Sequence, residues 1–308
     1  MKLIKQKLAF GKTIRFSWLQ ASILFVTCII FCVGGFFFWK QYAARSAKVI
    51  YPPEDEKTEV KALPPDVKKT LQPTTAEATF RVPILMYHYV EYVRDKKDTI
   101  RQLLDIVPAI FIEQIQTLQQ AGYTFMTAAE LGEVIDGTRQ LPPKPILLTF
   151  DDGHRDFYTD VLPILEKYHV KATSYVISGF LGGSDFMTPE QVQEVAKSGL
   201  VDVGAHTVHH IALAKKPLAT VQYELTTSKL AIEALIHKKV VSFAYPYGSF
   251  DKQAIQAVEA AGFTTAVSTV PGIDVNQQNR YFLYRLRPGI RTGKVLLNWL
   301  SQSTFTPW

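Results

Sequence analysis

The feature that most constrains the fold of this chain is a regular alternation of short apolar runs with amphipathic stretches, which begins near residue 80. Short apolar runs are typical of buried strands, and a 3.6-residue apolar period is typical of helices packed against them. The strand-like runs are 82–87, 146–150, 172–177, 201–205, 240–245, 264–267 and 282–286. The helix-like stretches are 111–121, 156–168, 189–197, 218–235, 252–261 and 293–300. This alternation predicts an α/β domain with a parallel sheet or barrel.

Local signals support several of these helix boundaries. Thr188 and Gln191 are spaced as a capping box, with Pro189 at the first helical position between them. Gly199 and Gly262 each follow a predicted helix, where glycine commonly ends the last turn. Residues 80–308 show no internal repeat, and we expect them to form one domain.

The positive charge of the chain is concentrated at its N-terminus. The chain has 34 Lys and Arg residues against 28 Asp and Glu residues, which gives a formal net charge of +6. Residues 1–40 contain six basic residues and no acidic residue, so they account for the whole excess. Because the remaining body is formally neutral, we expect no nucleic-acid partner.

Residues 21–39 form a run without any charge, long enough to cross a bilayer as a helix. The basic residues before it predict a cytoplasmic N-terminus over residues 1–20 and a single-pass anchor in the cell membrane. Residues 40–79 contain several prolines and predict an extended spacer, so the domain at 80–308 would lie outside the cytoplasm. The alternative is a signal peptide cleaved near residue 43 or 47.

The only two cysteines, Cys28 and Cys32, lie inside this apolar segment. The predicted exported body therefore has no disulfide, and its stability must come from packing.

The first group of candidate functional residues follows the strand-like run at 146–150. Asp151 and Asp152 are adjacent carboxylates at the predicted end of this strand, and Gly153 releases the chain after them. Within a strand the two side chains would point to opposite faces, but at its end both can reach one pocket. One carboxylate would then bind a metal while the other acts as a base. An ordinary Asp-Asp-Gly turn is the alternative interpretation.

The second group follows the strand-like run at 201–205. His206 and His210 have an i, i+4 spacing, which suits two ligands on one face. Two imidazoles and one carboxylate leave a coordination position for water or substrate, as in catalytic zinc sites. Four of the seven histidines, namely His154, His206, His209 and His210, fall in two strand-end segments, which favours a site over isolated histidines.

The third group ends the strand-like run at 240–245. Tyr245, Pro246, Tyr247 and Gly248 combine aromatic rings with a rigid backbone. They predict a flat-sided wall on which a sugar can stack, so we expect them to bind substrate. The alternative is an ordinary exit from strand to loop.

In their order and spacing these three groups resemble the polysaccharide deacetylase family, also called carbohydrate esterase family 4 or the NodB-homology domain. The family patterns are Thr-Phe-Asp-Asp-Gly at 149–153, His-Thr-x-x-His at 206–210 and Tyr-Pro-Tyr-Gly at 245–248. The likeness extends over residues 82–300. The run at 82–88 and the residues around Gln114 resemble the branch that includes the exported poly-β-1,6-N-acetylglucosamine deacetylases.

The resemblance implies a distorted parallel (β/α) barrel, preceded here by the predicted transmembrane helix, with the site at the C-terminal strand ends. It implies that Asp151 is the catalytic base and that Asp152, His206 and His210 bind a divalent metal ion, with zinc expected. A backbone N–H near Tyr247 would stabilise the oxyanion. The expected reaction removes acetyl groups from an extracytoplasmic polysaccharide that contains N-acetylglucosamine, and it releases acetate.

The chain departs from the family pattern at the third motif. Many members have an arginine there that orients the base, and residues 241–243 contain none. Arg285 or Arg287, both on one face of the predicted strand at 282–286 and its continuation, could supply this cation. A surface arginine pair is the alternative.

A second departure concerns the general acid. Many members carry a late Leu-x-His motif whose histidine is that acid, whereas the last histidine here is His237. His88, at the end of the first predicted strand, is the leading candidate for a catalytic histidine in the pocket. His154 and His209 are weaker candidates.

Three other functions are compatible with the same residues. The chain could deacetylate the amino sugars of peptidoglycan, or it could hydrolyse O-acetyl esters at the same metal site. It could also be a glycan-binding module without activity, although two intact aspartates and a full ligand set favour an enzyme.

Overall fold

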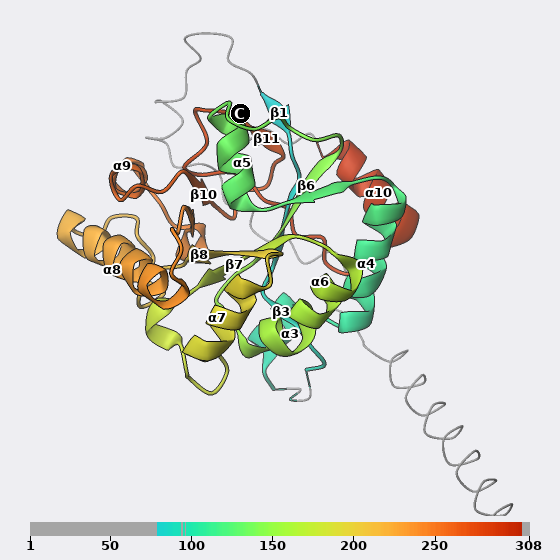
Figure 1. Ribbon diagram of the computed structural model, residues 1–308, viewed down its shortest axis with the longest axis horizontal. Coiled ribbons are helices and arrows are strands. Elements are labelled where there is room, and N and C mark those ends of the chain that lie inside the picture. The colour runs from blue at the N-terminus through green and yellow to red at the C-terminus, as the bar shows by residue number, and fades with distance from the viewer. Residues whose placement is uncertain (1–78, 94, 96, 304–308) are drawn as a thin grey trace, which may run out of the picture. The chain divides into compact units, whose positions relative to one another are not determined.

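The computed structural model describes residues 79–93, 95 and 97–303 (Figure 1). The predicted segments at 1–20 and 21–39, and the spacer at 40–79 up to its last residue, lie outside the described residues. Among the residues that are described, no helix combines the length and apolar character needed to span a membrane.

The centre of the domain is a curved sheet of seven strands that all run parallel. Six strands follow one another in the order β10-β9-β8-β7-β6-β2, and the short β5 pairs with the first half of β6. The strands are β2 (Ile84–Tyr87), β5 (Thr124–Met126), β6 (Pro145–Phe150), β7 (Ala172–Val176), β8 (Val201–Ala205), β9 (Ser242–Ala244) and β10 (Thr265–Val267). The predicted parallel barrel is thus present as a half-barrel with two edge strands.

The segment at 282–287 spans the gap between the edge strands β10 and β2. Leu283 pairs with Val267 in β10, and Leu286 pairs with Leu85 in β2, each as an isolated bridge. Between them the N–H of Arg285 donates to the carbonyl of Val270 at 2.9 Å. Because the segment changes partners at Arg285, no continuous ladder forms. The prediction of a strand at 282–286 is therefore wrong. The segment nevertheless lies between β10 and β2, where a further strand of the sheet would lie.

Helices cover the outer face of the sheet (Figure 1), and each helix-like stretch of the sequence is found as a helix. The stretch at 156–168 begins with a π-helical turn before it becomes regular. The helices are α4 (Pro108–Gln120), η1 (Phe157–Val161), α6 (Leu162–Tyr168), α7 (Pro189–Lys197), α8 (Leu218–Ile236), α9 (Lys252–Ala260) and α10 (Gly293–Gln302). The predicted capping box at Thr188 is confirmed, since its side chain and that of Gln191 cap each other's backbone N–H.

Several short elements complete the domain, and the sequence analysis identified none of them. They are β1 (Phe80–Arg81), β3 (Tyr89–Val90), α3 (Thr99–Leu104), β4 (Asp105–Ile106), α5 (Ala128–Ile135), η2 (Ser178–Phe180), η3 (Pro246–Gly248) and β11 (Asp274–Val275).

Helix α5 closes the N-terminal end of the half-barrel. Its first turn is fixed by a reciprocal capping box between Thr127 and Glu130. The backbone N–H of Ala128 donates to the hydroxyl of Thr173 on β7 at 2.9 Å. Leu131 and Val134 belong to the apolar cluster inside the half-barrel. Apolar side chains therefore fill the inside of the half-barrel at this end.

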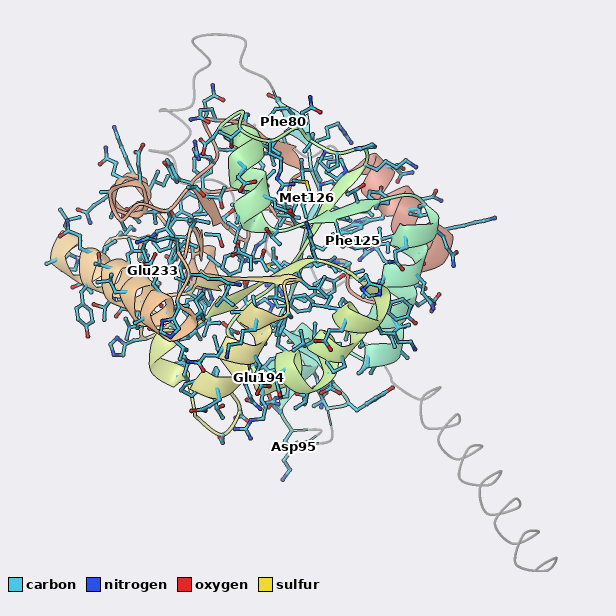
Figure 2. All side chains as sticks on the ribbon, in the orientation of Figure 1. Phe80, Asp95, Phe125, Met126, Glu194 and Glu233 are labelled. Atoms are coloured by element: carbon cyan, nitrogen blue, oxygen red, sulfur yellow. The ribbon has the colours of Figure 1, made fainter. Side chains whose placement is uncertain are left out.

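The apolar residues form two cores, one on each side of the sheet. A small cluster fills the inside of the half-barrel, and a larger one lies between the strands and the outer helices. The two labelled neighbours Phe125 and Met126 on β5 show this division (Figure 2), since Met126 belongs to the inner cluster and Phe125 packs against the outer one. Alternation along each strand therefore decides which core a side chain enters.

Gly204 on β8 is required by close packing inside the half-barrel. A Cβ atom at this position would lie 2.4 Å from the ring of Tyr175 on the neighbouring strand β7. Tyr175 is fully buried, so its ring has no free space into which it can move.

We therefore expect Gly204→Ala to lower the free energy of unfolding by about 1–3 kcal/mol, the usual cost of overpacking a core. Urea denaturation followed by circular dichroism would measure this. A double-mutant cycle with Tyr175→Ala provides the control, because the alanine at 204 should cost much less once the ring is removed. Equal costs in both backgrounds would contradict the packing argument.

Candidate active site and metal centre

The C-terminal ends of the parallel strands bring the first two groups of predicted site residues together. His88 directly follows β2, Asp151 and Asp152 follow β6, and His206 follows β8. Parallel strands place their carboxyl ends at one edge, and in barrels of this kind that edge carries the active site.

Asp152, His206 and His210 form a group that could hold a metal ion. One ligand atom from each of the three lies within 4.8 Å of the others. Oδ1 of Asp152 is 3.3 Å from Nε2 of His206 and 3.2 Å from Nε2 of His210. This Oδ1 atom is buried and has no hydrogen-bond donor. A buried carboxylate oxygen without a donor, facing two imidazole nitrogens, suits a bound cation.

The backbone of β9 sets the orientation of the His206 ring. Its Nδ1 lies 2.7 Å from the carbonyl oxygen of Ala244, so this nitrogen carries the proton and donates it. The lone pair of the neutral ring is then on Nε2, the atom that faces Asp152. A hydrogen bond of this kind from the distal nitrogen is typical of metal-binding histidines.

The segment from His206 to His210, whose spacing suits two ligands on one face, is a loop. Thr207 and His210 have φ angles of 67° and 52°, in the left-handed region. The backbone N–H of His210 donates to the hydroxyl of Thr207 at 2.9 Å. These turns fold the chain back so that both imidazoles reach Asp152.

The side chain of Glu224, on α8, binds this loop. Glu224 was not identified from the sequence. Its Oε2 accepts hydrogen bonds from the backbone N–H groups of Val208 and His209 at 2.8 Å and 3.0 Å. Its Oε1 lies 2.7 Å from Nδ1 of His209. Nδ1 of His209 is therefore held by Glu224 as part of this loop, and the role of His209 as a pocket acid stays a prediction.

Arg285 holds the carboxylate of Asp151 in a bidentate pair. Both Nη atoms lie 2.7 Å from the two carboxylate oxygens, and both side chains are almost fully buried. The guanidinium also donates to the carbonyl of Ser268 at 2.7 Å and to the hydroxyl of Thr149 at 3.1 Å. Of the two arginines proposed from sequence, Arg285 is the one beside the carboxylate, whereas Arg287 is exposed.

The surroundings of the two aspartates determine their charge. Burial raises the pKa of Asp151, but the opposing charge and hydrogen bonds of Arg285 outweigh it and hold this pKa below its ordinary value. Burial also raises the pKa of Asp152, but the hydrogen bond of His154 and the nearby rings of His206 and His210 outweigh it and hold that pKa well below its usual range. Both carboxylates are therefore ionised at neutral pH, as a base and a cation ligand need to be.

His88 lies beside Asp151, with its Nε2 3.9 Å from Oδ2 of the carboxylate. Burial lowers the pKa of His88 to about 4, although Asp151 and Asp152 act in the opposite direction. The ring is thus close to the carboxylate of Asp151 and neutral at pH 7, and its catalytic role stays a prediction.

The third group does not form the expected wall of four residues. Tyr245 is completely buried, and its hydroxyl donates to the carbonyl of Tyr281 at 2.9 Å. Gly248 is also buried, because the side chain of Thr269 packs where a Cβ atom would be. Tyr247 is 56% exposed, and its ring centre lies 4.6 Å from that of His210. Stacking on Tyr245 is therefore excluded, and Tyr247 presents its ring beside the ligand group.

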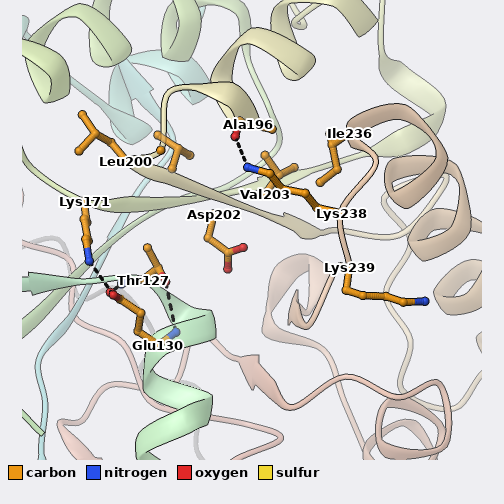
Figure 3. Close-up of a pocket in the computed structure, with 12 residues that line it drawn as sticks. Thr127, Glu130, Lys171, Ala196, Leu200, Asp202, Val203, Ile236, Lys238 and Lys239 are labelled. Atoms are coloured by element: carbon orange, nitrogen blue, oxygen red, sulfur yellow. Dashed lines mark hydrogen bonds and ion pairs between the residues drawn. The ribbon is translucent and has the colours of Figure 1, made fainter. Parts of the chain in front are cut away.

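A separate hollow lies at the other end of the half-barrel (Figure 3). It adjoins the first turn of α5 and the start of β8, whereas His206 follows the end of β8. Its charged groups are mostly engaged, since Lys171 pairs with Glu130 at 2.6 Å and Lys238 donates to the carbonyl of Ala196 at 2.6 Å. Burial raises the pKa of Asp202, which lines this hollow, to about 6.

Comparisons with known proteins agree with this geometry. The family model for polysaccharide deacetylases matches residues 138–266. YxkH of Bacillus subtilis (strain 168), described as a polysaccharide deacetylase, is 30% identical over 243 residues, which cover 77% of this chain and 83% of that protein. The poly-β-1,6-N-acetyl-D-glucosamine N-deacetylase of Staphylococcus aureus (strain NCTC 8325) is 25% identical over 57% of this chain and 65% of its own length, slightly less than two thirds.

Among solved structures, the deacetylase PplD of Streptococcus pyogenes superimposes with a TM-score of 0.67 and 28% identity, and the match covers 73% of this chain and 99% of that chain. Fold and relatives together define a hydrolase of non-peptide carbon–nitrogen bonds. The chain belongs to the polysaccharide deacetylase family.

The buried pair predicts a large effect on stability. Arg285→Met would leave Asp151 ionised and unpaired, and we expect the free energy of unfolding at pH 7 to fall by about 3–5 kcal/mol. In the wild type the lowered pKa of Asp151 stabilises the fold above its ordinary value of 3.8, and this contribution is lost as pH falls through the folded-state value. The deficit of the variant should therefore shrink as pH falls, first as its unpaired, buried Asp151 becomes protonated above the ordinary pKa, and then below 3.8 as the wild type loses the contribution of the pair.

Chemical denaturation at several pH values would measure this deficit. Arg287→Met is the matched control, since this arginine is exposed two residues away and its loss should change stability by less than about 0.5 kcal/mol. Equal effects of the two substitutions would refute the importance of the buried pair.

Proposed function

We propose that this protein is a metal-dependent N-deacetylase of an extracytoplasmic polysaccharide that contains N-acetylglucosamine. The observation that carries the proposal is the juxtaposition of two differently held carboxylates. Asp151 is ionised and fixed by Arg285, and the neighbouring Asp152 points an oxygen without a donor at two imidazoles. One carboxylate is thus arranged to accept a proton, and the other to bind a cation.

Asp152, His206 and His210 would hold the ion, and a mixed set of two imidazoles and one carboxylate suits zinc. A bound divalent ion would supply Lewis-acid activation of a water molecule and of the acetamide carbonyl. Three protein ligands would leave coordination positions open, as in catalytic zinc sites.

Asp151 accepts the proton of the attacking water in this proposal. Arg285 keeps the carboxylate ionised and fixes its direction, since two parallel hydrogen bonds permit a single orientation. The loop that carries Tyr247 lies beside His210, where a backbone N–H can donate to the developing oxyanion and the exposed ring can contact the sugar.

His88 faces the leaving amine in this proposal. It is neutral at pH 7, so it acts as a hydrogen-bond partner that can take up the proton gained by Asp151 and pass it on. The product amine leaves with that proton, and acetate is the second product.

The choice of polysaccharide rests on the relatives. The staphylococcal protein carries poly-β-1,6-N-acetyl-D-glucosamine in its name, and the PplD structure is a complex with acetate. Peptidoglycan amino sugars and O-acetyl esters are the competing substrates. The predicted anchor at 21–39 and spacer at 40–79 support an extracytoplasmic domain held near the membrane, where either glycan would be accessible.

We expect the purified full-length protein to release acetate from poly-β-1,6-linked N-acetylglucosamine oligomers, with little release from peptidoglycan strands or from O-acetylated sugars. An enzymatic acetate assay would measure this. Treatment with a chelator should abolish release, and added Zn²⁺ should restore it. A rate unchanged by complete metal removal would overturn the metal-dependent reaction. Oligomer binding by the metal-loaded protein without any acetate release would instead indicate a glycan-binding module.

The base assignment has its own test. We expect Asp151→Asn to lower kcat by about 10²–10⁴-fold, the usual contribution of a general base. The variant should still bind Zn²⁺ with wild-type affinity, because Asp151 is not among the three ligands. Steady-state acetate release and metal titration would be measured in parallel, with Asp152→Asn expected to lose both. An active Asp151→Asn variant would show that the base lies elsewhere.

A further inference from the structure

His154 occupies a closely packed position beside the candidate metal ligands. It follows Asp152 by two residues, it is buried, and its Nε2 lies 3.2 Å from Oδ2 of Asp152. The mechanism proposed above does not use this histidine. Its position directly behind a ligand carboxylate raises the question of what it does there.

The two oxygens of Asp152 have different partners because of His154. Oδ2 is next to the His154 ring, whereas Oδ1 has no hydrogen-bond donor and faces the candidate ligand nitrogens. Nδ1 of His154 is buried without a partner, so a proton there would be an unsatisfied buried donor. The ring proton therefore belongs on Nε2, from which it is donated to Oδ2.

Two aromatic rings prevent the His154 side chain from turning away. The ring of Tyr89 stacks on one face with a centre-to-centre distance of 3.9 Å, and the ring of Phe186 stacks at 5.0 Å. These residues come from distant segments, since Tyr89 is in β3 and Phe186 lies in the loop before α7.

Arg101 holds these two segments together from the outside. Its guanidinium lies 4.6 Å from the centre of the Tyr89 ring. It also pairs with Glu91, two residues after Tyr89, at 2.6 Å, and with Asp185, which directly precedes Phe186, at 3.4 Å. Arg101 thus bridges the two segments around His154 through two ion pairs, one to each segment.

We infer that His154 is a positioning residue for the metal site, because it occupies Oδ2 of Asp152 and thereby reserves Oδ1 for the cation. A carboxylate with two free oxygens can rotate or bind a metal through both. One fixed donor removes that freedom and leaves one oxygen directed at the imidazoles. This inference rests on the proposed metal-dependent function.

The variant that tests this is His154→Phe, which keeps a flat ring between Tyr89 and Phe186 and removes the donor. Loss of a residue that orients a metal ligand typically weakens metal affinity by 10–100-fold, and we expect the Kd for Zn²⁺ to rise by about that factor. Chelator competition with the full-length protein would measure it. We also expect the visible spectrum of the Co²⁺-loaded variant to change, since the second carboxylate oxygen becomes available.

Two further variants serve as controls. His154→Gln restores an N–H donor of similar reach and should recover part of the affinity. His237→Asn removes an exposed histidine at the end of α8, which is not part of the site, and should leave the Kd unchanged. Thermal unfolding of the metal-free proteins would show that the compared variants are folded.

The outcomes separate this inference from the proposed function. A wild-type protein that binds no divalent metal would overturn the proposed function. Tight binding by the wild type with the same Kd and Co²⁺ spectrum in His154→Phe would overturn the inference alone. If His154→Phe does not fold, Tyr89→Leu becomes the test, because it keeps the donor but opens the stack. Severalfold weaker binding would then support the role of the stack, and an unchanged Kd would contradict it.

Discussion

The bidentate pair between Arg285 and Asp151 is the interaction on which the rest of the site depends. It places a buried charge at the end of β6 and neutralises it from the segment that spans the open side of the half-barrel. A lone buried carboxylate would become protonated or would destabilise the fold. Because the segment at 282–287 changes partners at Arg285, the guanidinium reaches into the half-barrel while the flanking residues stay attached to β10 and β2.

The two ends of the parallel strands have different roles. The N-terminal end contributes to stability, and the C-terminal end carries the candidate site. At the N-terminal end, α5 fills the half-barrel with apolar side chains and its first turn bonds to β7. At the C-terminal end the inside is polar, and side chains from distant loops meet. The carboxylate of Glu224 binds the backbone of the loop at 206–210, and the ring of Tyr89 stacks on His154. Neither Glu224 nor Tyr89 is a candidate metal ligand. The ligands thus depend on contacts between segments far apart in sequence.

Much of the fold and part of the site could be predicted from the sequence. Strand ends followed by Asp or His were visible as local patterns, so Asp151, Asp152, His206 and His210 could be grouped without coordinates. The capping-box residues at Thr127 are also visible in the sequence and indicate the start of α5. The helix is short, so its apolar period is a weak signal. Tyr245 was expected to contact a sugar. Alternation along β9 and the residue after it instead places Tyr245 on the helix-facing side with Phe243, where it is buried. The contacts of Glu224 could not be predicted, because only tertiary packing brings α8 beneath the histidine loop.

The central claim is that Asp152 binds the cation, while the neighbouring Asp151 stays paired to Arg285 and does not bind it. A crystal structure of the protein grown with Zn²⁺, with anomalous diffraction recorded at the zinc edge, tests it most directly. The account predicts a single strong anomalous peak about 2.0–2.2 Å from Oδ1 of Asp152 and from Nε2 of both His206 and His210, with Asp151 still paired to Arg285. A peak bound to Asp151, or no peak at these ligands, would contradict it.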